Sequence, residues 1–201
     1  MHSWKTELDR LEADLPPNPP RFQVHESLPL AILRYDPENE WELRRHLTLL
    51  GSRLQARGRH IVRISLADLV WEALDRDDPP DSFAKFCELE RREGFEAAHI
   101  QAGRALAPNK TQRPRARALS ERVAAKLAAL DPLKDIAFLT RAASLGPGLY
   151  PVSKLVDQLQ GHLKVPTVLC YPGRREGQTG LVFLNLPERD ASGSYRVNIY
   201  G

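Results

Sequence analysis

Short apolar runs alternate with stretches of helical periodicity along most of this chain. Residues 28–35, 60–66, 135–141 and 166–171 are apolar runs of the length expected for buried strands. Between the first two runs, leucines recur every three or four residues from Leu43 to Leu54, which marks one face of a helix. A strand, a helix and a second strand in this order predict a βαβ unit with parallel strands. The pattern therefore predicts an α/β fold, with a mostly parallel central sheet flanked by helices.

Turn residues set the expected limits of these elements. Asp36 followed by Pro37 predicts a helix start, with aspartate as the N-cap and proline at the first helical position. Gly58 is a natural helix terminator, and Pro172-Gly173 is expected to close the strand over 166–171. Two final strands, 181–186 and 195–200, are predicted to pair as a C-terminal hairpin.

The region between the second and third strands has a helical pattern. A polar break over 75–81 leads into a helical stretch over 82–107, and another helix is expected over 115–130. In the first stretch the predicted core contacts are Phe83, Phe86, Phe95 and Ile100. Residues from about 75 to 132 are therefore interpreted as a helical insertion into the sheet.

The N-terminal residues have a separate character. Trp4, Leu8 and Leu11 recur at helical spacing within 3–14, and four prolines follow within residues 16–20. We interpret 1–20 as a helical arm with a Pro-rich linker, and 21–201 as a single α/β domain. The apolar face of the arm has two candidate roles: packing on the body of its own chain, or docking on a partner protein.

Composition narrows the class of protein. Of the 201 residues, 42% are hydrophobic and 27% charged, which is ordinary globular usage. There is no apolar run of about 18 residues, as a membrane helix needs, and no signal-peptide pattern at Met1. Cys87 and Cys170 are too few for a disulfide framework. We therefore expect a cytoplasmic protein without membrane contact.

Positive charge gathers in one window. The net charge is only +3, yet residues 104–126 hold seven basic side chains and one acidic one. Such a segment can be a solvated loop, dock on an acidic protein or neutralise phosphates. Aromatic residues that could stack on bases are missing from the window. The candidate contacts to nucleic acid or to an acidic partner are Lys110, Arg113, Arg115 and Arg117.

Motifs for catalysis are weak. The glycine-rich segment from Gly146 to Lys154 follows a strand, but it lacks the Gly-Lys pair of a phosphate-binding loop. The histidines are scattered, and Cys170 ends an apolar strand in which a small side chain usually packs. Asp36 and Asp68 follow predicted parallel strands, where α/β sheets bind ligands, and their carboxylates could hold magnesium. Helix capping also explains Asp36, and capping or pairing with an arginine also explains Asp68. We expect no enzymatic activity, no metal and no cofactor, with a cryptic nucleotide site as a remaining alternative.

A series of short motifs extends over residues 28–200. It comprises Leu33–Glu38, Ile64–Leu69, Phe138–Pro147, Val152–Gln160, Pro166–Gly173, Gly177–Leu181 and Tyr195–Tyr200. As a set, this series resembles BrxB, the small component of BREX bacteriophage-exclusion systems. The chain departs from the family's Thr-Gly-Val-Gly after the third strand, where it has Thr140-Arg141-Ala142-Ala143.

The resemblance implies a role in a multi-protein defence system and supplies no catalytic residues. Such a system marks host DNA by methylation and blocks phage replication. The resemblance also implies association with PglZ, a larger component of the alkaline-phosphatase superfamily, and contact with DNA through the complex. The leading hypothesis is thus a non-catalytic adaptor, with a nucleic-acid-binding subunit that uses 104–126 as the alternative.

Overall fold

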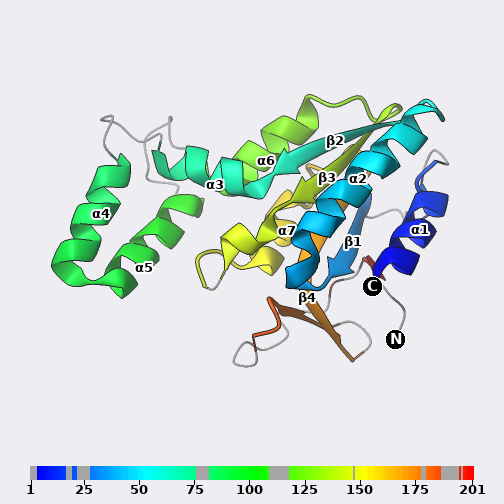
Figure 1. Ribbon diagram of the computed structural model, residues 1–201. Helices are drawn as coiled ribbons and strands as arrows, with labels where there is room; N and C mark the ends of the chain where they lie inside the picture. The colour runs from blue at the N-terminus through cyan, green and yellow to red at the C-terminus, as the bar shows by residue number, and fades with distance from the viewer. Residues whose placement is uncertain are drawn as a thin grey trace.

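The computed structural model of the chain has three layers, a parallel sheet between two layers of helices (Figure 1). The residues described are 4–16, 20–21, 28–75, 82–108, 118–146, 148–177, 180–186, 195 and 197–201. They confirm the predicted fold class, an α/β protein with a mostly parallel sheet.

The elements follow the order expected from the apolar pattern. The strands are β1 (Leu30–Tyr35), β2 (His60–Ser65), β3 (Asp135–Thr140), β4 (Thr167–Glu176), β5 (Gly180–Phe183) and β6 (Asn198–Tyr200). The α-helices are α1 (Trp4–Asp14), α2 (Glu40–Gln55), α3 (Leu66–Asp75), α4 (Ser82–Glu93), α5 (Phe95–Leu106), α6 (Leu119–Ala128) and α7 (Val152–Leu159). Two 3-10 turns, η1 (Pro37–Asn39) and η2 (Ala142–Leu145), follow β1 and β3.

The strands lie in the order β2-β3-β4-β1-β6, and every neighbouring pair in this row is parallel. The predicted βαβ unit therefore spans two intervening strands, because β1 and β2 are separated by β4 and β3. Four helices, α3 to α6, connect β2 to its neighbour β3. This agrees with the predicted helical insertion.

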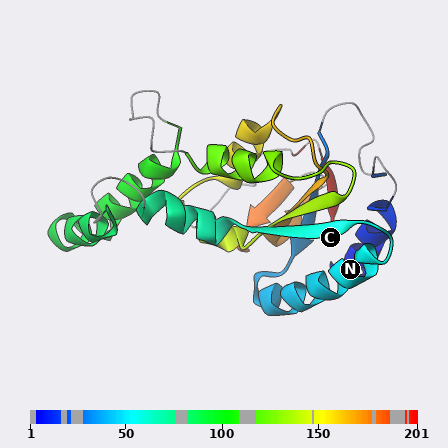
Figure 2. The ribbon, with the colours of Figure 1, turned by 90° about the horizontal axis from the view of Figure 1, so that it is seen from above.

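Alternate residues of the central strands point into two separate cores. In β3, Ile136 and Phe138 pack with α1 and α2, whereas Ala137 and Leu139 pack with α3, α6 and α7. β1 and β4 divide in the same way, which explains why their sequences are apolar at successive positions. The view in Figure 2 places α1 and α2 on one side of the sheet and α6 and α7 on the other.

The N-terminal helix belongs to one of these cores. Trp4, Leu8 and Leu11 are buried together with residues of β1 and α2, so of the two candidate roles the structure shows packing on the chain's own body. Asp14 accepts a hydrogen bond from the Tyr200 hydroxyl at 2.9 Å, which ties the helix to β6. The face predicted as a partner-binding surface is occupied in this structure, and we do not propose it as one.

The C-terminal strands differ from the predicted hairpin. β5 pairs antiparallel with β4, and β6 pairs parallel with β1. Pro172-Gly173 does not end β4, which continues to Glu176. The Pro172 carbonyl still accepts a hydrogen bond from the Leu184 amide, and Gly173, at φ 153°, leaves room for the Val182 carbonyl that a β-carbon would overlap. These two residues therefore allow the strand to pass from the parallel sheet into an antiparallel pair.

Helices α4 and α5 project away from the sheet as a pair (Figure 1). They are joined at Gly94, whose φ of 88° favours glycine. The prediction that Phe83, Phe95 and Ile100 are core residues was wrong, since their side chains are 43%, 68% and 46% exposed. The helical spacing identified the elements but could not show that the pair extends beyond the body.

Candidate functional site

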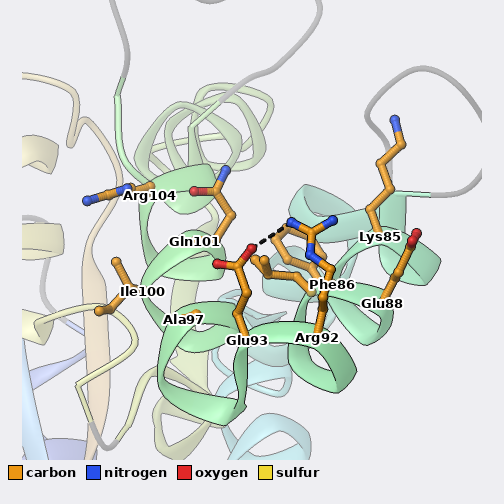
Figure 3. Close-up of a pocket in the computed structure, with 10 residues that line it drawn as sticks. Lys85, Phe86, Glu88, Arg92, Glu93, Ala97, Ile100, Gln101 and Arg104 are labelled. Carbon is orange, nitrogen blue, oxygen red and sulfur yellow. Dashed lines mark hydrogen bonds and ion pairs between the residues drawn. The ribbon is translucent and has the colours of Figure 1, made fainter.

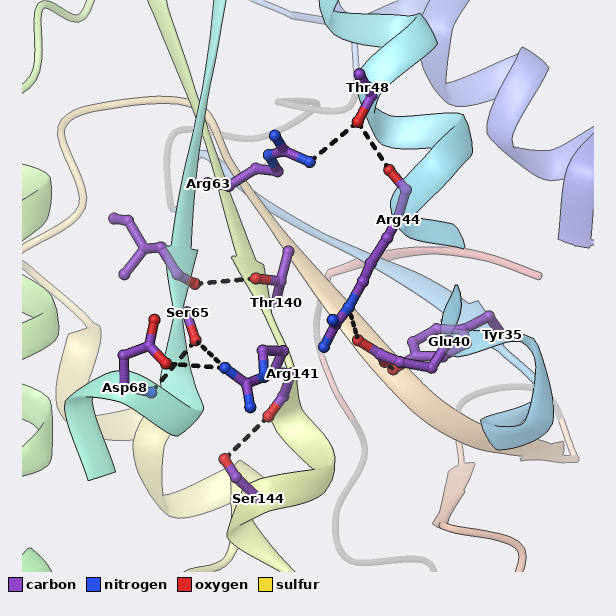
Figure 4. Close-up of polar contacts among 11 residues, drawn as sticks. Tyr35, Glu40, Arg44, Thr48, Arg63, Ser65, Asp68, Thr140, Arg141 and Ser144 are labelled. Carbon is purple, nitrogen blue, oxygen red and sulfur yellow. Dashed lines mark hydrogen bonds and ion pairs between the residues drawn. The ribbon is translucent and has the colours of Figure 1, made fainter. Parts of the chain in front are cut away.

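Polar side chains meet at the carboxyl ends of β2 and β3. Arg141, directly after β3, donates from Nη1 to Asp68 Oδ1 at 2.8 Å and to Ser65 Oγ at 3.4 Å (Figure 4). The Ser65 hydroxyl also accepts from the Asp68 amide at 3.2 Å. Asp68, a candidate magnesium ligand by its position, is thus paired with an arginine. Pairing with an arginine is one of the two structural explanations that the sequence offers for Asp68, the other being helix capping.

Arg141 adopts a backbone conformation that favours glycine. Its φ of 59° and ψ of 37° lie in the left-handed region, which costs an ordinary residue about 1–2 kcal/mol. This is the position at which the chain departs from the Thr-Gly-Val-Gly pattern. The ion pair with Asp68 is a contact that glycine could not make.

Asp36, the second candidate carboxylate, also has an arginine partner. Arg34 Nη1 donates to Asp36 Oδ1 at 2.9 Å. The predicted N-cap role was wrong in its detail, because the Asp36 side chain makes no capping hydrogen bond and a 3-10 turn separates it from α2. The predicted position of Pro37 at the start of the helical segment is confirmed.

Glu40, at the start of α2, accepts hydrogen bonds from a side chain of β1 and from a side chain of α2. It accepts a short hydrogen bond from the Tyr35 hydroxyl and a bond of 3.0 Å from Arg44 Nε (Figure 4). Burial is the main cause that raises the pKa of Tyr35 above its usual value, and the bond to Glu40 adds to it. The phenol therefore stays protonated and serves as a buried donor.

The segment that follows β3 and η2 packs against β5. A β-carbon on Gly146 would overlap the Phe183 ring, and the same ring packs on Tyr171 with centroids 5.5 Å apart. Gly146 begins the glycine-rich segment that was weighed as a phosphate loop, and Lys154 of that segment lies over the Tyr150 ring. Aromatic packing therefore accounts for both residues in this structure.

The other groups weighed for chemistry are dispersed or buried. Within the described residues, no three His, Cys, Asp or Glu side chains gather as a metal site. Cys170 is fully buried, and this burial raises the pKa of its thiol. The described helices include none with the length and apolar character needed to cross a bilayer.

The basic window is only partly described. Lys110, Arg113, Arg115 and Arg117 lie outside the described residues. Arg122 of the same window is buried and lies 3.9 Å from Glu72 of α3, so it cannot belong to an exposed basic surface. Arg104, at the end of α5, is exposed.

One buried charge lies at the opposite edge of the sheet. Arg59 precedes β2 and is only 4% exposed, and none of its three guanidinium nitrogens has a hydrogen-bond partner among the described residues. Burial lowers its pKa, and the charge of Asp135 opposes this effect. A pattern of residue types gives no signal for such a position.

A groove lies between α4 and α5. It encloses about 730 Å³, and Figure 3 shows side chains of both helices along it. Its apolar residues are Phe86, Leu89, Ala97 and Ile100; its polar residues are Lys85, Glu88, Arg92, Glu93, Gln101 and Arg104. Helical spacing predicts two of these residues, Phe86 and Ile100, as core contacts, so the sequence gives no signal for the groove.

The comparison with protein families decides the identity of the chain. The model of the family described as BREX protein BrxB matches residues 62–199. The chain belongs to the BrxB family. Membership makes it a component of a BREX anti-phage system and confirms the resemblance found in the sequence. None of the curated proteins and none of the solved structures matches it.

The matched region of the BrxB family runs from β2 to β6 and includes the whole α4–α5 pair. It also includes Asp68 and Arg141. Asp36, Glu40 and the N-terminal helix lie before it. The groove therefore belongs to the part of the chain on which family membership rests.

Proposed function

We propose that this BrxB-family protein is a non-catalytic adaptor, which binds a larger component of its BREX system and helps to assemble the complex. The observation that carries the proposal is the projecting α4–α5 pair. Among the described residues, α4 contributes no buried side chain, while Phe83, Phe95 and Ile100 expose apolar surface. Phe86, Leu89, Ala97 and Ile100 line one groove between the two helices. Apolar side chains gathered in such a groove are typical of protein-interaction sites.

The carboxyl edge of the sheet supports a non-catalytic role. Ligands of open α/β sheets usually bind there. In this chain Asp36 and Asp68 are paired with arginines, and Phe183 packs against Gly146 in the segment that follows β3. The polar side chains at this edge thus have structural partners within the chain.

The larger component is a PglZ-like protein, according to the resemblance described above. The test is co-expression of the tagged chain with the PglZ-like protein of the same operon, followed by affinity purification at low and physiological salt. Stoichiometric retention is expected. Failure to retain the PglZ-like protein at either salt concentration contradicts the adaptor role.

A nucleic-acid-binding role is the second candidate, because residues 109–117 hold four basic and no acidic side chains. Phosphate contacts make affinity fall steeply with salt. The test compares DNA retention by the wild type with a variant that has alanine at Lys110, Arg113, Arg115 and Arg117. Equal retention by the two proteins excludes this role.

A further inference from the structure

We propose that the α4–α5 groove binds an amphipathic helix of the larger BREX component, which places an acidic side chain against Arg104. This inference rests on the proposed adaptor function and adds the site and the chemistry of the partner. The helix would lie along α4 and α5 and complete a three-helix packing unit. Helices in grooves are a common mode of peptide recognition.

The floor of the groove is suited to a helix with an apolar face. Phe86 and Leu89 come from α4, and Ala97 and Ile100 from α5, so both walls supply apolar contacts. Ile100 is 46% exposed, and no side chain of the described chain covers it fully. α4 has 12 residues and is about 18 Å long, which matches a partner helix of about three turns.

The charged side chains that line the groove indicate which charge the partner should carry. Arg92 is paired with Glu93 at 2.6 Å, and the charge of Glu88 also acts on Arg92. Arg104 is the only charged residue that α5 contributes to the groove, and among the described contacts it has no ion pair. The α5 wall thus presents an apolar strip that ends in an uncompensated positive charge.

Lys85 lies at the same end of the groove as Arg104. The chain reverses at Gly94, and the two residues are at similar distances from it along α4 and α5. In Figure 3 Lys85 points away from the turn between the helices, whereas Arg104 points sideways from α5, to the side opposite α4. Lys85 likewise has no ion pair among the described contacts, although Glu88 lies one helical turn away. Lys85 therefore adds positive charge at this end of the groove, and the acidic side chain of the partner pairs with Arg104.

The site is tested first by photo-crosslinking. A benzophenone amino acid replaces Ile100 in the full-length tagged chain, which is co-expressed with the PglZ-like protein. In the control it replaces Leu133, which is 68% exposed and lies outside the α4–α5 pair. We expect a crosslink from position 100 to a segment of the PglZ-like protein with apolar residues at helical spacing and at least one acidic residue. Position 133 should give none.

Affinity measurements test the chemistry of the same contact. Ile100→Glu should weaken the complex by about 30-fold or more, as expected at a buried interface centre. Arg104→Glu should weaken it by about 10-fold, with an effect that decreases as salt rises. Replacement of the acidic residue found in the crosslinked segment by arginine should restore binding to Arg104→Glu. Leu133→Glu is the matched control and should bind like the wild type.

The outcomes separate this inference from the adaptor proposal. If the complex forms but Ile100→Glu and Leu133→Glu bind equally well, the groove inference is wrong and the adaptor role stands. Crosslinks from position 100 to nucleic acid or to a second copy of this chain also overturn it. If the wild-type chain forms no complex, both proposals fail. Thermal unfolding of each variant should match the wild type, because the altered side chains are exposed.

Discussion

Replacement of Arg59 by methionine should increase the stability of this protein, because it removes a buried charged group and keeps a side chain of similar length in its place. Arg59 is 4% exposed, and within the described part of the chain none of its guanidinium nitrogens has a hydrogen-bond partner. An ionised group in this state loses its hydration without a compensating contact. Methionine keeps an unbranched stem of similar length and contributes no polar atom.

The magnitude follows from the contacts that the substitution changes. Leaving one buried polar group unpaired costs about 1–3 kcal/mol, and a charged group costs more. Part of this cost is offset by the attraction of Asp135, which acts on the Arg59 charge. Asp135 keeps its bond from the Asp131 amide and its contact with His60 after the substitution. We therefore expect the free energy of unfolding to rise by about 1–3 kcal/mol.

The assay is equilibrium unfolding in urea, with thermal unfolding as a second measurement. A gain of 1 kcal/mol corresponds to about 2–4 °C in melting temperature for a chain of this size. Arg57→Met is the control, because Arg57 is 52% exposed and its nearest acidic contact, Glu12, is 3.9 Å away. It should change the free energy of unfolding by less than about 0.5 kcal/mol. A loss of more than 1 kcal/mol for Arg59→Met alone would refute the reasoning.

Three further predictions concern the packing, the backbone and the ionisation of this fold. Leu11→Ala should lower the free energy of unfolding by about 2–5 kcal/mol, measured in urea, because Leu11 is fully buried under the sheet; an effect below 0.5 kcal/mol would mean that the N-terminal helix is not part of the core. Arg141→Gly should be about 1 kcal/mol more stable than Arg141→Ala in the same assay, since both lose the Asp68 ion pair but only glycine relieves the left-handed backbone; equal stabilities would argue against this conformation. Burial raises the pKa of Tyr171 and Tyr200, whereas tyrosines of the unfolded chain ionise near pH 10. The free energy of unfolding, measured in urea, should therefore keep its full value below about pH 10 and decline above it. A flat profile from pH 8 to 11 would contradict the burial of these phenols.

The sequence was sufficient for the elements that fill the two cores. The runs at β1, β3 and β4 are apolar on both faces, and the leucines of α2 recur on one stripe, so local pattern and tertiary burial agree. The wrong predictions have a different origin. Pro172 and Gly173 have the composition of a turn, yet they continue β4. β5 pairs with this part of β4 and brings the Val182 carbonyl close to Gly173. The local sequence of β4 cannot show this pairing.

The candidate site was the least accessible to sequence reasoning. Phe83, Phe95 and Ile100 have the spacing of core residues, and the spacing is the same whether a helix faces its own domain or projects from it. Pairing of Asp68 with an arginine could be anticipated as an alternative to metal binding. Its partner, Arg141, is distant in the sequence and is brought close only by the pairing of β2 with β3.

The cores lie around the sheet, whereas the proposed binding groove lies between the projecting helices α4 and α5. This separation affects how the protein tolerates amino-acid substitutions. The side chains described in α4 are outside the cores, so most substitutions on its exposed face should alter the free energy of unfolding by less than about 0.5 kcal/mol. Mutations there can therefore retune which protein is recognised while the sheet and its two helical layers remain intact. In this architecture a new binding specificity can arise without a compensating repair of the interior.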